Sequence, residues 1–109
     1  MHNSALAQAG LDGYYLAFKV ADIAAAVSGI RGLGIRGASI TIPHKISVMK
    51  YLDQVDALAA EIGAVNTVVN HKDVLHGYNS DCAGAVKALT EKTVIHGKDV
   101  AVVGAGGGA

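Results

Sequence analysis

Three short polar clusters stand near the ends of strand-like stretches of this sequence, and their residue types suit chemistry on a small polar ligand. Hydroxyls and amides can hydrogen-bond to a polyhydroxylated molecule, and an ammonium can bind a carboxylate or a developing oxyanion. A lysine beside an aspartate also suits proton transfer, because the carboxylate can orient the lysine. The clusters are Thr41, His44 and Lys45; Asn66 and Thr67 within "GAVNT"; and Asn79, Ser80 and Asp81.

The only proline of the chain, Pro43, directly precedes His44 and Lys45. Proline cannot donate to a sheet ladder, so we expect it to end the preceding strand, and its fixed φ directs the turn that follows. Lys45 then stands at the start of an expected helix, where the helix dipole disfavours a positive charge. This placement favours a lysine that acts as a base.

Structural roles remain open for each of these residues. A lysine in the first turn of a helix is most often solvated, and Asp81 in front of "CAGAV" is a good N-cap. Thr41 is an ordinary strand residue. Asn66 is harder to explain in this way, because strands disfavour asparagine and a buried amide must be hydrogen-bonded.

The composition describes a small neutral protein with an aliphatic core. Of 109 residues, 51% are hydrophobic and only 5% aromatic, and nine basic residues balance nine acidic ones. This balance gives no sign of a nucleic-acid partner, and no apolar run approaches the roughly 18 residues of a membrane span. The histidines lack metal-ligand spacing, so no metal is expected. The single cysteine, Cys82, is expected to be a small core residue in a reducing, cytoplasmic location.

Strands alternate with helices along the sequence. This order predicts an α/β three-layer sandwich, with a mostly parallel sheet, helices on both faces and one antiparallel hairpin. In such sheets ligands bind beyond the carboxyl ends of the strands. Helices are expected at 2–9, 22–34 (with Asp22 as N-cap), 46–52, 54–62 (with Asp53 as N-cap) and 81–91, and strands at 14–20, 38–42, 64–70, 75–79 and 99–104.

The C-terminal segment combines a hydrophobic strand with a glycine-rich turn. Gly104, Gly106 and Ala109 match the pattern G-x-G-x-x-G/A, whose glycines let the backbone approach a pyrophosphate. A turn without a ligand is the alternative. We expect both ends of the chain to be cut, with a domain boundary near Gly97 that separates residues 1–97 from the start of a dinucleotide-binding unit at 98–109.

Four segments together, in this order and spacing, resemble the shikimate dehydrogenase family: "SITIPHK", "IGAVNTVVN", "GYNSD" and "VAVVGAGGGA". The resemblance covers essentially the whole chain. It implies the reversible, NADP-dependent reduction of 3-dehydroshikimate to shikimate, in aromatic amino acid biosynthesis. It also implies a substrate domain followed by a Rossmann-type domain, with the active site in the cleft between them.

The resemblance implies a role for each matching residue. Lys45 corresponds to the catalytic lysine and Asp81 to its partner aspartate. Thr41 and Asn66 correspond to ligands of the substrate hydroxyls. The cofactor's glycine-rich loop corresponds to Gly104, Ala105, Gly106 and Gly107.

The sequence also departs from the family pattern. The family's first strand with its serine loop, and the Rossmann domain after the glycine loop, are expected to be missing, so this chain alone is expected to be inactive. Ser80 stands where threonine is usual. Two alternatives remain: a quinate/shikimate dehydrogenase that uses NAD or NADP, and a truncated, non-catalytic module that binds a small acid. A homodimer is also left open.

Overall fold

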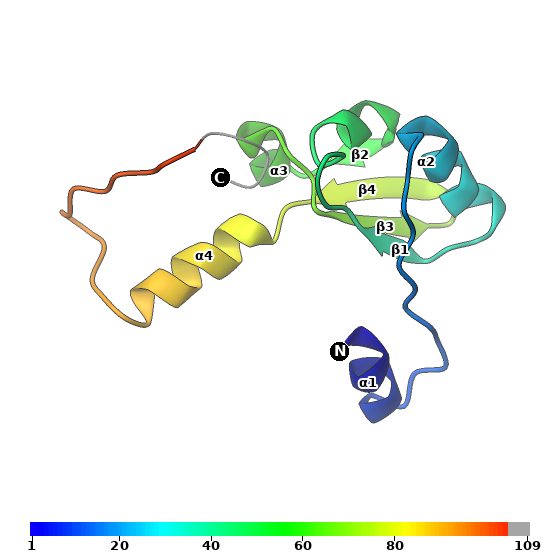
Figure 1. The fold of residues 1–109 in the computed structure, drawn as a ribbon, viewed down its shortest axis with the longest axis horizontal. Coiled ribbons are helices and arrows are strands. Elements are labelled where there is room, and N and C mark those ends of the chain that lie inside the picture. The colour runs from blue at the N-terminus through cyan, green and yellow to red at the C-terminus, as the bar shows by residue number, and fades with distance from the viewer. Residues whose placement is uncertain (105–109) are drawn as a thin grey trace.

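A four-stranded mixed sheet forms the centre of the computed structural model, which describes residues 1–104 (Figure 1). β3 is antiparallel to both β1 and β4, while β2 and β4 are parallel. Three strands therefore run in one direction and β3 alone runs against them, which confirms the α/β class with a sheet that is mixed. In the order in which they lie side by side, the strands are β1 (Gly37–Ser39), β3 (Thr67–His71), β4 (Val74–Tyr78) and β2 (Gln54–Val55).

The expected antiparallel hairpin is formed by β3 and β4. Lys72 and Asp73 make its turn with φ values of 51° and 66°, and positive φ at both central residues is the mark of a type I′ turn. Asn70 holds the turn, because its Oδ1 accepts from the backbone N–H of Asp73 at 2.9 Å while its Nδ2 donates to the carbonyl of Ile35 at 2.9 Å.

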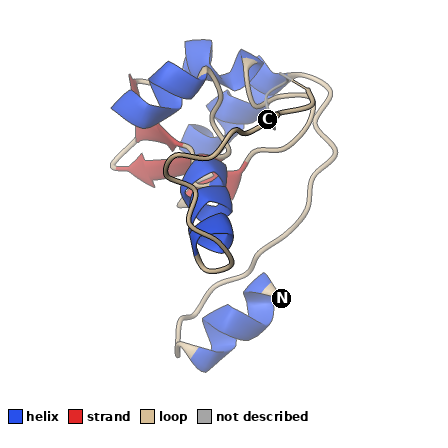
Figure 2. Cartoon of the chain, turned by 90° about the vertical axis from the view of Figure 1, so that its left-hand side faces the viewer, coloured by secondary structure: helices blue, strands red, loops and turns tan. Residues whose placement is uncertain are grey.

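Three helices cover one face of the sheet: α2 (Ile23–Gly32), the 3-10 helix η1 (Ser47–Tyr51) and α3 (Ala57–Ile62) (Figure 2). Alternate strand residues point towards these helices, as the period of two in a strand requires. The resulting core is aliphatic, as the composition indicates. Its buried members are Val27, Ile30, Val48, Ala59, Val65, Val68 and Leu75.

The remaining helices, α1 (His2–Gln8) and α4 (Asp81–Thr90), contain no buried residues and extend away from this body (Figure 1). The second helical layer of the expected sandwich is therefore not packed on the sheet. The face of the sheet away from α2 and η1 exposes Val69, Val74 and Tyr78 by about two fifths each. None of the helices in residues 1–104 has the length and apolar character needed to cross a membrane.

Two expected strands are wrong. Residues 14–20 and 99–104 are irregular, because a strand needs a neighbour for its ladder hydrogen bonds and no described strand lies beside either segment. Side-chain contacts from α1 hold residues 14–20 instead. Asn3 exchanges two hydrogen bonds with the backbone of Tyr15, at 2.9 and 2.6 Å, and His2 stacks on the Tyr15 ring.

The two expected helices at 46–52 and 54–62 also differ from the structure. The first is a 3-10 helix of five residues, and the second begins only after the short strand β2. Asp56, rather than Asp53, caps α3 by accepting from the N–H of Leu58 at 3.1 Å. Asp53 serves a different purpose: it binds Arg31 of α2 at 2.8 Å and the N–H of Leu75 at 2.7 Å.

Candidate active site

Lys45 and Asp81 form an ion pair at one end of the sheet, with Lys45 Nζ donating to Oδ2 of Asp81. Lys45 lies in the turn between β1 and η1, and Asp81 is the first residue of α4. The Lys45 side chain is 14% exposed and the Asp81 side chain 50% exposed. The lysine side chain is therefore mostly covered, while the aspartate side chain is half exposed to solvent.

The backbone around Lys45 is fastened to the loop that leads into β3. After the cis Ile42–Pro43 bond, the N–H of His44 donates to the carbonyl of Thr41 at 2.9 Å and closes the turn. The carbonyl of Lys45 then accepts from the N–H of Val65 at 2.8 Å. The backbone of Lys45 is thus held by a hydrogen bond from a fully buried residue, Val65, in addition to the contacts of the Lys45 side chain.

The side-chain amide of Asn66 has all of its hydrogen-bonding groups occupied. Its Oδ1 accepts from Thr67 Oγ1 at 2.8 Å and from the N–H of Ser80 at 3.1 Å. Its Nδ2 donates to Oδ1 of Asp81 at 2.7 Å and to Oγ of Ser80 at 3.0 Å. Asn66 is only 9% exposed, so these contacts satisfy the requirement of a buried amide for partners. They also determine which way the amide faces.

The environment of Asp81 favours its charged form. The hydrogen bond from Lys45, followed by the hydrogen bond from Asn66, holds the pKa of Asp81 below its usual value of 3.8. Asp81 is therefore a carboxylate at neutral pH. In this state it can hold the ammonium of Lys45 in one place and accept a hydrogen bond from a ligand hydroxyl.

The structure brings together Lys45, Asp81 and Asn66, but not every residue singled out in the sequence. Thr41 is exposed, and within residues 1–104 its hydroxyl makes no hydrogen bond. His44 lies within 2.9 Å of the carbonyl of Val20 through its Nε2, so it fastens residues 14–20 to the turn.

The cofactor residues lie at the limit of the described chain. Gly104 is exposed and has a φ of +100°, which glycine adopts more readily than other residues. The expected sites at Ala105, Gly106 and Gly107 fall outside the described residues. No group of three or more metal-binding side chains comes together within residues 1–104.

Sequence reasoning grouped Asn79 with the site but missed what its side chain does. Its Nδ2 donates to the carbonyl of Ala64 at 2.9 Å, and its Oδ1 accepts from the N–H of Asp81 at 3.0 Å. Ser80, the N-cap residue of α4, makes no capping hydrogen bond with its side chain. An asparagine two residues before a helix that begins with aspartate is a signal for such a turn.

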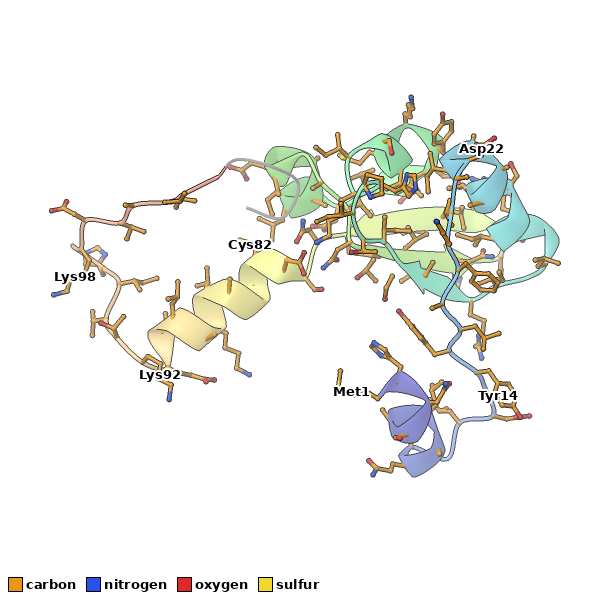
Figure 3. All side chains as sticks on the ribbon, viewed as in Figure 1. Met1, Tyr14, Asp22, Cys82, Lys92 and Lys98 are labelled. Carbon is orange, nitrogen blue, oxygen red and sulfur yellow. The ribbon has the colours of Figure 1, made fainter. Side chains whose placement is uncertain are left out.

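Cys82 is not the core residue that we expected. It is exposed on α4, at the end of this helix that faces the sheet (Figure 3). The expectation was wrong because α4 buries none of its residues.

A family model matches more than half of this chain. The family model for the shikimate dehydrogenase substrate-binding domain matches residues 1–68. Shikimate dehydrogenase (NADP(+)) of Geobacillus kaustophilus is 48% identical over 113 residues, an alignment that covers 100% of this chain and 41% of that protein. The chain therefore spans about two fifths of the length of this relative.

Two solved structures are similar in both fold and sequence. Shikimate 5-dehydrogenase of Thermus thermophilus in complex with shikimate has a TM-score of 0.86 and 33% identity, covering 98% of this chain and 42% of that one. Shikimate 5-dehydrogenase of Listeria monocytogenes in complex with shikimate and NAD has a TM-score of 0.78 and 44% identity. It covers 83% of this chain and 32% of that one.

Proposed function

The chain belongs to the family of shikimate dehydrogenase substrate-binding domains, and on this premise we propose that it supplies the substrate site of an NADP-dependent shikimate dehydrogenase. The reaction is the reversible reduction of 3-dehydroshikimate to shikimate. One observation carries the proposal: a lysine whose side chain is mostly covered is paired with a half-exposed aspartate, and a buried asparagine donates to the same carboxylate.

In the direction of reduction, the carbonyl carbon of 3-dehydroshikimate gains a hydride and the carbonyl oxygen gains a proton. Lys45 donates this proton from Nζ, is left neutral and regains a proton from solvent. In the direction of oxidation Lys45 takes the proton from the hydroxyl. Asp81 accepts from Lys45 throughout, so the lysine is held in one orientation for proton transfer.

Asn66 and Thr41 are proposed to bind the hydroxyls of the substrate. Asn66 Nδ2 already donates to Asp81 and to Ser80, so a substrate hydroxyl must replace one of these contacts. The contact with Ser80 Oγ is the longer one, at 3.0 Å against 2.7 Å, and Ser80 is exposed. It is therefore the contact that we expect to exchange. Thr41 offers an exposed hydroxyl from the turn that carries Lys45.

The residues at the end of the described chain fit a dinucleotide. Gly104 has a φ of +100°, and no atom of residues 1–104 lies within 4 Å of where a Cβ would stand. Both features suit a backbone that approaches a pyrophosphate. We propose that Gly104, Ala105, Gly106 and Gly107 hold NADP there. When bound, NADP supplies or accepts the hydride; the residues of this chain position the substrate and move the proton.

The proposed division of labour follows the chain. Residues 1–97 form the shikimate-binding catalytic unit, and residues 98–109 begin the dinucleotide-binding unit. Gly97, at a φ of +72°, lies in the turn between them. We also propose a cytoplasmic location, which the free cysteine supports. A homodimer is a further proposal, and sedimentation velocity of the complete protein would test it.

The test is an assay of shikimate oxidation by the protein encoded by the complete reading frame. NADP and NAD are each supplied, and quinate is assayed in parallel with shikimate. Efficient turnover of shikimate with NADP is the expected result. Faster turnover of quinate, or a preference for NAD, would reassign the protein to the quinate/shikimate branch. A folded protein that turns over neither acid but binds shikimate would instead be a binding module.

A further inference from the structure

A chain of hydrogen bonds joins the backbone of Asp81 to the backbone of Lys45. The N–H of Asp81 donates to Oδ1 of Asn79 at 3.0 Å, and Nδ2 of Asn79 donates to the carbonyl of Ala64 at 2.9 Å. The same peptide unit continues as the N–H of Val65, which donates to the carbonyl of Lys45 at 2.8 Å. Both members of the ion pair are thus fastened to one peptide unit.

We propose that Asn79 is a positioning residue for the proton-transfer pair, because it holds the start of α4 at the distance from the Lys45 turn that the ion pair requires. This inference deepens the proposed function and rests on it for the catalytic part of its test. Asn79 does not itself contact the ammonium; it acts through the backbone of Asp81.

The need for such a tie follows from how α4 is attached. α4 has no buried residues, so packing against the sheet does not determine its position. Its first turn is held by the Lys45–Asp81 ion pair, by Asn66, and by Asn79. Two of these contacts belong to the functional groups themselves. Asn79 is therefore the contact that can hold α4 while Asp81 and Lys45 rearrange around a substrate.

Only an amide at position 79 can perform both tasks. The carbonyl oxygen accepts from a helix N–H, as serine and aspartate can also do at a helix start. The NH2 group donates to Ala64, which is only 1% exposed. A serine at position 79 can still accept from the N–H of Asp81, but its side chain is too short to reach Ala64. The variant Asn79→Ser therefore removes the hydrogen bond to Ala64 and retains a neutral acceptor for the N–H of Asp81.

A matched control exists at the opposite end of the hairpin. Asn70 also joins two segments, since its Nδ2 donates to the carbonyl of Ile35 and its Oδ1 accepts from the N–H of Asp73, both at 2.9 Å. Asn70→Ser removes the same kind of tie with no contact to the ion pair. A comparison of the two variants separates a positioning effect from a general loss of stability.

The first measurement does not depend on activity. The pKa of Asp81 is measured in the complete protein by following its side-chain carboxyl carbon in an NMR titration. Because the hydrogen bond from Lys45 lowers this pKa, a misplaced pair must raise it. We expect the pKa of Asp81 to rise towards its usual value in Asn79→Ser and to stay unchanged in Asn70→Ser.

The second measurement is kinetic. In shikimate oxidation we expect Asn79→Ser to lower kcat by on the order of tenfold to a hundredfold, as for a displaced catalytic group, with a smaller change in KM. Asn70→Ser is expected to retain the parent kcat. Should Asn79→Ser fail to fold, Asn79→Asp replaces it in the kinetic comparison, because aspartate can still accept from the N–H of Asp81 but cannot donate to Ala64.

An unchanged Asp81 pKa together with an unchanged kcat in a folded Asn79→Ser protein would overturn the inference. An equal loss of kcat in Asn79→Ser and Asn70→Ser would overturn it as well, because the effect would then be general. If the parent protein does not oxidise shikimate, the proposed function fails, and the NMR comparison still decides whether Asn79 positions the pair.

Discussion

The side-chain amide of Asn66 donates to Oδ1 of Asp81 at 2.7 Å, while the other oxygen of the same carboxylate accepts from Lys45. Asp81 is therefore held from the sheet side and from the turn side at once. Since Asn66 is 9% exposed and Asp81 is exposed, the buried amide provides the fixed point and the carboxylate is the more accessible of the two groups.

Replacing this fixed point should harm both stability and activity. Asn66→Ala removes two donors and an acceptor, so the N–H of Ser80 and the hydroxyl of Thr67 lose their partner. We expect a loss of about 1–3 kcal/mol in the free energy of unfolding, measured by urea denaturation. Turnover of shikimate should fall further than this loss of folded protein explains. A variant as stable and as active as the parent would contradict the role of Asn66.

The lysine of the ion pair is the proposed proton donor and acceptor. In the complete protein we expect Lys45→Ala to lower kcat for shikimate by about 10²–10⁴-fold, the range typical of general acid–base catalysis. Lys50→Ala serves as control, because Lys50 lies on η1 with its Nζ 5.3 Å from the centre of the Tyr51 ring and is exposed. It should retain parent activity. Normal turnover by a folded Lys45→Ala protein would remove the assignment.

The Arg31–Asp53 pair predicts how stability depends on acid. The hydrogen bond from the N–H of Leu75, and then that from Arg31, hold the pKa of Asp53 below its usual value of 3.8. A group whose pKa is lowered by folding stabilises the protein above its unfolded pKa and ceases to do so as the pH falls through its folded pKa. We therefore expect Asp53→Asn to be less stable than the parent at pH 7, with the difference shrinking below about pH 4.

Urea unfolding of the parent and of Asp53→Asn at pH 7 and pH 3 measures this difference. Asp12→Asn is the control, because Asp12 is exposed and forms no ion pair with any other residue in 1–104. The free energy of unfolding of Asp12→Asn should match that of the parent at both pH 7 and pH 3. A deficit in Asp53→Asn that stays the same at pH 3 would show that the loss comes from something other than the charge of Asp53.

Two glycines with opposite surroundings predict opposite effects of the same substitution. A Cβ at Gly77 would lie 2.5 Å from Cδ1 of Leu52 and 2.9 Å from Cγ2 of Val65, which is fully buried. We expect Gly77→Ala to destabilise the protein by about 1–3 kcal/mol. Gly29, inside α2, has nothing within 4 Å of such a Cβ, so Gly29→Ala should stabilise by about 0.5–1 kcal/mol. Thermal denaturation of both variants provides the comparison.

The parts of the fold that local sequence determines were predicted well. Asp22 caps α2 by accepting from the N–H of Ala25, and the hairpin follows from its turn. The errors arise where contacts between residues far apart in the sequence determine the local structure. Residues 14–20 have the composition of a strand, but no strand within residues 1–104 pairs with them. Asp53 precedes a helical pattern but is bound by Arg31, 22 residues earlier.

The site was predicted in part for the same reason. Residue types and the family resemblance predict that Lys45 and Asp81 act together. The structure has their side chains in an ion pair, and their catalytic role stays a prediction. The tie from Asn79 to Ala64 joins residues 15 positions apart through a backbone carbonyl. Every residue has a backbone carbonyl, so the type of the residue at position 64 could not indicate this contact.

The direction of β3 has a consequence for how the site is encoded. Lys45 follows β1 and Asp81 follows β4, whereas Asn66 precedes β3. The pairings of Thr67 with Ser39 and with Tyr78 place the start of β3 beside the ends of its two neighbours. If β3 were parallel to its neighbours, a residue just before β3 would lie at the opposite end of the strands. Because β3 runs against its neighbours, a residue before the N-terminal end of one strand shares a site with residues that follow the C-terminal ends of two others.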